Sequence, residues 1–381
     1  MRLLLLLLLL PCACREAQVR ASPPNLPDRT LSEGFQRGVN YAHVHSRGHG
    51  YGSEASAREL DWLAAMGVTH IAITPFGYQH GATADRLAGW DSVGDRFVPR
   101  DGSMSDASLR NEIAAAHARG IAVTIKPQIW SHDFWNGLEW HGSVRQREGR
   151  EHETWWRSYR AFALHYARLA SDAGAETYCV GVELVQVSVR YPDEWRSLIA
   201  ETRSFYKGAL TYAAHWDREP EAIGFWDDLD AIGVNAYFPL DVPDTAGVDA
   251  LVAAWRPYAD RLSLLSRAGQ RPIVFLEAGY RPVRGTFREP WRYDGGEVDL
   301  SVQARGYEAM FRALHDSTWF LGVYLWKAFT DPDRASQFGE DMGFTFGRRP
   351  AEMVVRRWYG GGREREHGPE GRCYGVPWEV R

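Results

Sequence analysis

The chain has 381 residues, with 44 lysines and arginines against 49 aspartates and glutamates, so its formal net charge at pH 7 is −5. This balance excludes the basic surface that a phosphate backbone requires, and no nucleic acid partner is expected. Hydrophobic residues make up 45% of the chain, which excludes a disordered or fibrous protein, and its 16 tryptophans and 17 tyrosines exceed the needs of a core and indicate an aromatic binding cleft.

The first residues have the pattern of an export signal. Met1 and Arg2 give a positive start, and leucine fills 3–10, a run far too short to span a bilayer. Residues 1–14 are therefore expected to be a signal peptide, and no transmembrane span is expected. Cys14 is either the lipid anchor of a lipoprotein or a residue beside a simple cleavage site. Both alternatives place the protein in the periplasm, outside the cell or lipid-anchored at the cell envelope.

The composition also sets the expected domain limits. A Pro-rich, polar stretch follows the leader, and a glycine run near residue 360 is followed by a charged stretch with little apolar area to bury. We therefore expect a linker over 15–30, one domain over 31–359 and a flexible tail over 360–381.

Within the domain, short β-branched runs alternate with longer amphipathic ones, which is typical of strand–helix units around a parallel sheet. Eight strands are expected at 38–42, 69–74, 122–126, 177–183, 209–214, 231–237, 273–277 and 322–326. Helices are expected at 54–66, 107–119, 153–173, 193–206, 249–266, 300–314 and 351–358, with a weaker one at 222–228. Eight units in one run predict the α/β class and a single (β/α)8 TIM barrel.

Two connections are unusually long for a compact barrel. They cover 76–104 after the second strand and 128–150 after the third, and both are rich in aromatic and polar residues. Connections of this length are usually functional, so we expect them to form walls of a substrate cleft.

Two carboxylates end otherwise apolar strands, Glu183 on the fourth and Glu277 on the seventh. In a barrel of this kind the loops at the carboxyl ends of the strands build the site, and these two strands lie opposite each other. Two facing carboxyl groups suit the cleavage of a glycosidic bond, in which one acid protonates the leaving oxygen and one carboxylate attacks the sugar. No metal or organic cofactor is required by this mechanism.

Further residues at the strand ends suit a sugar, because pyranose rings stack on aromatic faces while their hydroxyls bond to polar side chains. Trp326 is the expected floor beneath the reacting sugar. The other candidate substrate-binding residues are Asn40, Lys126, Trp130, His215, Asn235, Tyr237 and Lys327.

Several ordered stretches resemble the glycoside hydrolases of clan A, and most of all family 113, whose described members are β-mannanases. The resemblance covers residues 38–359. It rests on Val123-Thr-Ile-Lys-Pro127, Cys179-Val-Gly-Val-Glu-Leu184, Leu210-Thr-Tyr-Ala-Ala214, Phe225-Trp-Asp-Asp-Leu-Asp-Ala-Ile-Gly-Val-Asn-Ala-Tyr-Phe-Pro-Leu240, Pro272-Ile-Val-Phe-Leu-Glu-Ala-Gly-Tyr280 and Tyr324-Leu-Trp-Lys327. It implies β-linked oligosaccharide or polysaccharide as substrate, most of all β-1,4-mannan, and net retention of configuration. It also implies roles for four residues: Glu183 as acid/base, Glu277 as nucleophile, Tyr237 as a hydrogen-bond partner of Glu277, and Trp326 as the stacking platform.

The sequence departs from the clan at one position. Many clan A enzymes place Asn immediately before the acid/base, where its amide bonds the sugar 2-hydroxyl, and here that position is Val182. Asn40 or Asn235 could supply this hydrogen bond from another strand. We expect Glu183 to be protonated when substrate binds, and Tyr237, with Lys126 or Arg281 as a more distant positive charge, to keep Glu277 ionised.

Two alternatives come from other functional classes. His43 and His45 after the first strand, with His215 and Asp331, resemble the ligand set of a metal-dependent amidohydrolase barrel. A non-catalytic carbohydrate-binding barrel at the cell surface is the other alternative, because a shared fold does not establish activity.

Overall fold

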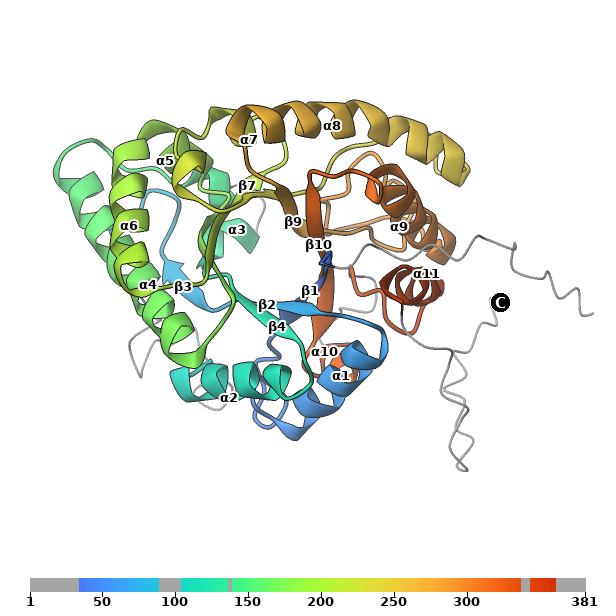
Figure 1. The fold of residues 1–381 in the computed structure, drawn as a ribbon, viewed down its shortest axis with the longest axis horizontal. Coiled ribbons are helices and arrows are strands. Elements are labelled where there is room, and N and C mark those ends of the chain that lie inside the picture. The colour runs from blue at the N-terminus through green and yellow to red at the C-terminus, as the bar shows by residue number, and fades with distance from the viewer. Residues whose placement is uncertain (1–33, 89–103, 136–138, 337–342, 361–381) are drawn as a thin grey trace, which may run out of the picture.

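The computed structural model describes residues 34–88, 104–135, 139–336 and 343–360. Within them, parallel strands close a barrel in the order β1-β10-β9-β8-β7-β6-β4-β2, and helices surround it (Figure 1). The barrel strands are β1 (Gln36–Ala42), β2 (His70–Ile73), β4 (Ala122–Ile125), β6 (Thr177–Val182), β7 (Ala209–His215), β8 (Ile232–Asn235), β9 (Ile273–Ala278) and β10 (Phe320–Phe329). Each predicted strand corresponds to one of them, and the predicted (β/α)8 TIM barrel is confirmed.

The long helices that cover the barrel also lie where the amphipathic pattern predicts them. They are α1 (Glu54–Ala65), α2 (Asp106–His117), α4 (Arg150–Ala173), α6 (Pro192–Phe205), α8 (Val248–Gly269), α9 (Leu300–Leu314) and α11 (Pro350–Tyr359). The hydroxyl of Ser53 accepts a hydrogen bond from the backbone N of Ser56 and so caps α1. The single helix predicted at 222–228 is wrong: the chain forms α7 (Glu219–Ala222) and a 3-10 turn, η2 (Trp226–Asp228), separated by Ile223, Gly224 and Phe225.

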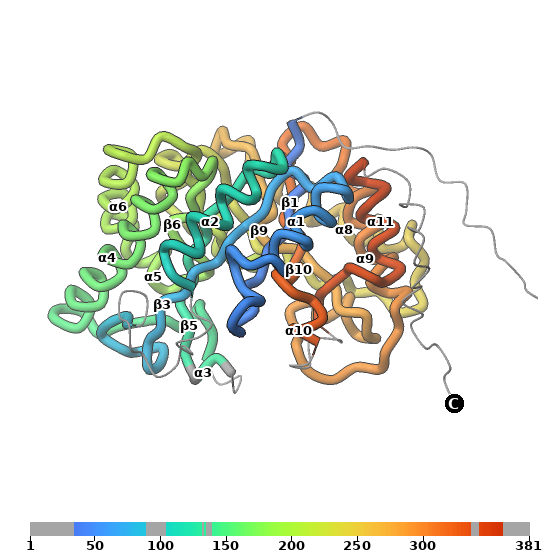
Figure 2. Tube along the Cα trace, turned by 90° about the horizontal axis from the view of Figure 1, so that it is seen from below, coloured from blue at the N-terminus to red at the C-terminus, as the bar shows by residue number. Residues whose placement is uncertain are grey.

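The two long connections contain regular structure that the sequence pattern did not predict. β3 (Phe76–Gln79) and β5 (Gln128–Ser131) pair in parallel as a separate two-stranded sheet, followed by α3 (His132–Trp135) and η1 (His141–Ser143). Figure 2 shows β3, β5 and α3 at the end of the molecule where α10 (Pro332–Ser336) follows the last barrel strand. This second sheet therefore extends one wall of the barrel beyond its carboxyl rim.

Side chains, mainly small and aliphatic ones, fill the inside of the barrel, so it is not an open channel. The interior cluster contains Ala72, Cys179, Val182, Ala213, Ala231, Val274, Leu276 and Tyr324. The outward side chains of the same strands pack against the helices in a much larger cluster that contains most of the buried aromatic rings. Functional side chains can therefore gather only above this filled interior, at the carboxyl rim.

A bulge in β9 turns Glu277 into the barrel. Leu276 packs in the interior and Phe275 on the outside, so continued alternation would send Glu277 outward. Between Phe275 and Ala278, however, β9 advances three residues while β10 advances two. The extra residue reverses the alternation, as bulges beside active sites commonly do.

A matching bulge lies in β6. Between Cys179 and Val182, β6 advances three residues while β7 advances two, and both side chains face the interior. Glu183 follows directly with a φ of 49°, a left-handed conformation that residues other than glycine seldom adopt. The backbone at this position therefore differs from a simple strand end, which is consistent with a functional constraint.

Among the helices of the described residues, none has both the length and the apolar character needed to cross a bilayer. The predicted signal peptide, Cys14, the linker and residues 361–381 of the predicted tail lie outside the described residues, while Gly360 is the C-cap of α11.

Candidate active site

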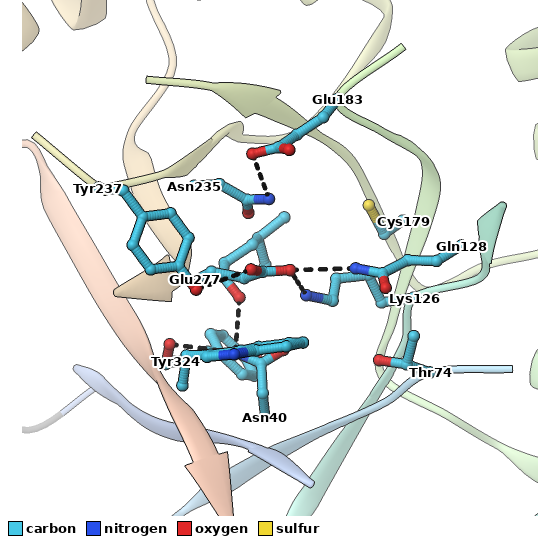
Figure 3. Close-up of polar contacts among 12 residues, drawn as sticks. Asn40, Thr74, Lys126, Gln128, Cys179, Glu183, Asn235, Tyr237, Glu277 and Tyr324 are labelled. Carbon is cyan, nitrogen blue, oxygen red and sulfur yellow. Dashed lines mark hydrogen bonds and ion pairs between the residues drawn. The ribbon is translucent and has the colours of Figure 1, made fainter. Parts of the chain in front are cut away.

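Glu183 and Glu277 enter the same end of the barrel from different strands. Glu183 follows the last residue of β6, and Glu277 is the second-last residue of β9. Figure 3 shows Asn235 beside Glu183, and Lys126, Gln128 and Tyr237 around Glu277. The structure thus brings the two predicted carboxylates into one polar cluster at the carboxyl ends of the strands.

Glu277 is buried and held by three donors. Its Oε1 accepts hydrogen bonds from Lys126 Nζ at 2.5 Å and from Gln128 Nε2 at 3.0 Å, and its Oε2 accepts one from the Tyr237 hydroxyl at 3.0 Å. The predicted Tyr237 contact is therefore present. Lys126 is closer than expected: its ammonium group forms a direct ion pair with Glu277. A carboxylate with donors on both oxygens is fixed in orientation and suited to attack.

Glu183 has a different environment. It is half-buried, and its Oε1 accepts a hydrogen bond from Asn235 Nδ2 at 3.0 Å. Burial and the negative charge of Glu277 raise the pKa of Glu183 to about 8, against the opposing effects of the Asn235 hydrogen bond and of Lys126. Glu183 is therefore a carboxylic acid at neutral pH, which is the state that a proton donor needs.

Trp326 forms the third part of the site. It is half-buried in β10, its Nε1 donates to the hydroxyl of Tyr293 at 2.7 Å, and Lys126 Nζ lies 5.2 Å from its ring centroid. Lys327 Nζ lies at the same distance from this ring and 4.7 Å from that of Phe329. The Trp326 ring is thus oriented by a hydrogen bond and lies beside the ion pair of the nucleophile candidate.

The two candidate asparagines have different partners. Asn40 donates to the backbone oxygens of Leu276 and Tyr324, at 2.8 and 3.1 Å, so its amide joins β9 to β10 at the bulge before Glu277. Asn235 donates to Glu183 instead. The Asn40 amide therefore supports the backbone that presents Glu277, and the Asn235 amide contacts the carboxyl group of Glu183 directly.

His215 lies in an aromatic cluster on the rim. In the pairing of β7 with β8 it lies opposite Asn235. Its ring centroid is 4.6 Å from that of Trp140 and 5.2 Å from that of Trp216, and Trp216 stacks on Trp291 at 5.3 Å. Trp140 and Trp291 are 40% and 43% exposed. These rings form an aromatic rim that continues from the β7–β8 side of the site toward solvent.

Trp130 lies in the second sheet. It is half-buried in β5, where its ring contacts those of Phe134 and His141 at 5.9 and 5.7 Å. These contacts place the ring within the aromatic packing of the 128–150 connection.

Two functional candidates were missed in the sequence. Gln128 is the first residue of β5 and contacts Glu277. In the sequence, only its position two residues after Lys126 could have indicated this contact. Glu219 is buried beside the segment that follows Glu183, with Ser188 and Tyr212 as partners. In the sequence, Glu219 and Glu221 have the pattern of acidic residues on a solvent-exposed helix start, so nothing marks Glu219 as buried.

The histidines of the amidohydrolase alternative do not form a ligand set. His43 Nδ1 accepts a hydrogen bond from the backbone N of Tyr51, and Asp331 pairs with His49 at 2.7 Å. Across the described ranges, no group of three or more His, Cys, Asp or Glu side chains is arranged to hold a metal ion. The structure therefore provides no support for this alternative.

Comparisons with known proteins agree with the geometry. The family model described as Glycoside Hydrolase Family 113 matches residues 39–347. A GH113 β-mannanase from Alicyclobacillus acidocaldarius, solved in complex with ManMIm, is 29% identical with a TM-score of 0.73, and the match covers 86% of this chain and 97% of that one. A second structure, of a GH113 β-1,4-mannanase, is 25% identical with a TM-score of 0.72, covering 86% and 99%. The curated proteins gave no match.

Proposed function

Since the chain belongs to glycoside hydrolase family 113, and is therefore a glycoside hydrolase, we propose that it cleaves β-1,4-linked mannan with net retention of configuration. Family membership favours this activity over a non-catalytic sugar-binding barrel and over an amidohydrolase. The observation that carries the proposal is the contrast between two neighbouring carboxyl groups, an ion-paired Glu277 and a Glu183 that keeps its proton.

In the first step Glu277 is the nucleophile and Glu183 the acid. A carboxylate oxygen of Glu277 forms a bond to the anomeric carbon while the bond from that carbon to the leaving oxygen breaks. The proton of Glu183 moves to the leaving oxygen, so the departing sugar leaves as a neutral alcohol. The donors on Glu277, namely Lys126, Gln128 and Tyr237, keep it pointed at the sugar that lies on Trp326.

In the second step the now ionised Glu183 acts as a base. It takes a proton from a water molecule, whose oxygen attacks the anomeric carbon of the glycosyl-enzyme. The bond to Glu277 breaks, and the carboxylate regains its ion pair with Lys126. Two inversions at the same carbon give retention of configuration.

Asn235 is the better candidate for the sugar 2-hydroxyl contact that Val182 cannot make. Its Nδ2 donates to Glu183, while its buried Oδ1 has no hydrogen-bond partner within the described ranges. An acceptor beside the acid can bind a hydroxyl next to the anomeric carbon. Asn40 Oδ1 likewise has no partner there, but the Asn40 amide nitrogen donates to two backbone carbonyls rather than to Glu183, which favours a supporting role.

The aromatic rim suits a polymer rather than a small glycoside. His215, Trp140 and Trp291 extend the aromatic surface beyond the catalytic pair, and half-exposed rings of this kind can stack on further sugar units. We therefore include internal cleavage of a chain in the proposal.

The test is a side-by-side assay of β-1,4-linked mannan, glucan and xylan oligomers. We expect turnover of the mannan series, and the β-anomer as the first product in the proton NMR spectrum. First appearance of the α-anomer would reject the double displacement, and a preference for glucan or xylan would reject the mannan specificity.

For location, we propose that residues 1–14 direct export and that Cys14 is the anchor candidate. Mass spectrometry of the mature N-terminus decides between lipidation and simple cleavage. A mature chain that still begins at Met1 would reject both.

A further inference from the structure

A third carboxylate lies beneath the segment that carries Glu183. Glu219 in α7 is 2% exposed, and its oxygens accept three hydrogen bonds: from Ser188 Oγ at 2.5 Å, from the Tyr212 hydroxyl at 2.7 Å and from the backbone N of His215 at 2.6 Å. A backbone N–H can only donate, so the carboxyl oxygen facing His215 must accept. All three contacts therefore favour the ionised form of Glu219.

These contacts hold both ends of the segment after Glu183. The Tyr212 hydroxyl accepts a hydrogen bond from the backbone N of Leu184 at 2.7 Å, so its own proton is free for Glu219. Ser188 lies in α5 (Val185–Arg190), one turn further along. Glu219 thus binds the segment through Tyr212 at its start and directly through Ser188.

We propose that Glu219 is a positioning residue for Glu183, because it fixes the backbone segment that presents this carboxyl group. The negative charge of Glu219 acts on Glu183 as well. The inference rests on the proposed role of Glu183 as acid/base. The positioning role explains why Glu219 is buried although a carboxylate prefers water. Within the described ranges Glu219 forms no ion pair.

The charges around Glu183 make this effect measurable. Glu277 on β9 and Glu219 on α7 both raise the pKa of Glu183, whereas Lys126 after β4 lowers it. Asn235 on β8 lowers it by a hydrogen bond. Burial lowers the pKa of His215 on β7 to about 4, so this ring adds no charge at neutral pH.

Glu219 itself titrates in the working range. Burial raises its pKa to about 7, against the lowering effect of its three hydrogen bonds. As the pH rises through 7, Glu219 therefore gains the charge that opposes ionisation of Glu183.

The decisive variant is Glu219→Gln, with Glu221→Gln as its matched control. Glu221 lies on the same short helix but pairs with Arg261 at 2.5 Å, away from the Glu183 segment. We expect Glu219→Gln to lower kcat about 10-fold through misplacement of Glu183. We also expect the alkaline limb of kcat/KM to move to lower pH by roughly 0.5 units, because one like charge is lost. Glu221→Gln should match the parent in both respects.

Ser188→Ala provides a second, milder test if the first variant folds poorly. It removes one donor from Glu219, disfavours the charged form and should move the alkaline limb in the same direction by a smaller amount. An unmoved limb in every variant that folds would overturn the positioning role while leaving the hydrolase intact. A parent protein that cleaves no glycoside would overturn the proposed function and this inference together.

Discussion

The ammonium group of Lys126 lies 2.5 Å from Oε1 of Glu277, and the two side chains are 0% and 8% exposed. Lys126 directly follows β4 and Glu277 lies in β9, 151 residues apart in the chain. A buried ion pair of this kind seldom adds net stability, because both charges lose their hydration, but removal of one partner leaves the other charge unpaired. The pair is better explained by the proposed role of Glu277, because the lysine fixes this carboxylate and favours its charged form.

Lys126→Met should therefore destabilise the fold by about 3 kcal/mol, because it leaves Glu277 buried without its cation. Urea unfolding measures this change. The double variant Lys126→Met/Glu277→Gln should recover much of the loss, since no unpaired charge remains. The control is Lys207→Met, which removes an exposed lysine and should unfold like the parent. If the double variant loses as much free energy of unfolding as the two single variants together, the two side chains are not coupled.

Glu183→Ala and Glu277→Ala should each lower the turnover of mannan oligomers by at least about 1,000-fold, but azide should separate their roles. In Glu183→Ala, an aryl glycoside whose leaving group needs no protonation still forms the glycosyl-enzyme with Glu277. Azide then attacks this intermediate and gives a β-glycosyl azide. In the second variant azide attacks from the side of the missing nucleophile and gives the α-azide. Proton NMR of the products decides, and exchanged outcomes would reverse the two assignments.

The alkaline limb of kcat/KM should lie near pH 8, because the raised pKa keeps Glu183 protonated below it and the acid is lost as the pH rises through it. Asn235→Ala removes a donor that favours the carboxylate form, so the limb should move to higher pH while kcat falls. Asn111→Ala on the exposed face of α2 is the control. A limb that moves to lower pH in Asn235→Ala would contradict the contact with Glu183.

Trp326→Ala should lower kcat/KM for mannan oligomers by about 100-fold, which corresponds to roughly 2.7 kcal/mol of lost transition-state packing. Trp319→Ala is a matched control, because Trp319 is also a half-buried tryptophan but precedes the first residue of β10, at the amino end of the strand. Tyr293→Phe removes only the partner of the Trp326 nitrogen and should show a smaller loss. Equal losses in the Trp326 and Trp319 variants would show that stability, not stacking, explains the effect.

The barrel was predictable from sequence because each of its strands is a short apolar run that must be buried. The second sheet was not. β3 and β5 have only four residues each and begin after Pro75 and Pro127, where a missing backbone N–H normally signals the end of a strand. Here the backbone N of Gln128 bonds to the oxygen of Pro75 at 2.9 Å, so pairing continues beyond both prolines.

The site was predictable only in part. Glu183, Glu277, Tyr237 and Trp326 lie at strand ends, in stretches that resemble the family, so the sequence marks them as candidates. Glu219 becomes recognisable only when the fold places it between α5 and β7, because its role depends on the hydroxyls around it. Contacts across the barrel leave little trace in the local sequence.

The extra residues in β6 and β9 also bear on how such a site can be transferred. Grafting two glutamates onto an unrelated barrel with evenly paired strands would leave one of them facing the helices, however well the residue types matched. The offset in strand pairing is thus as much a part of the proposed catalytic apparatus as the two acids, and an engineer would have to copy it together with them.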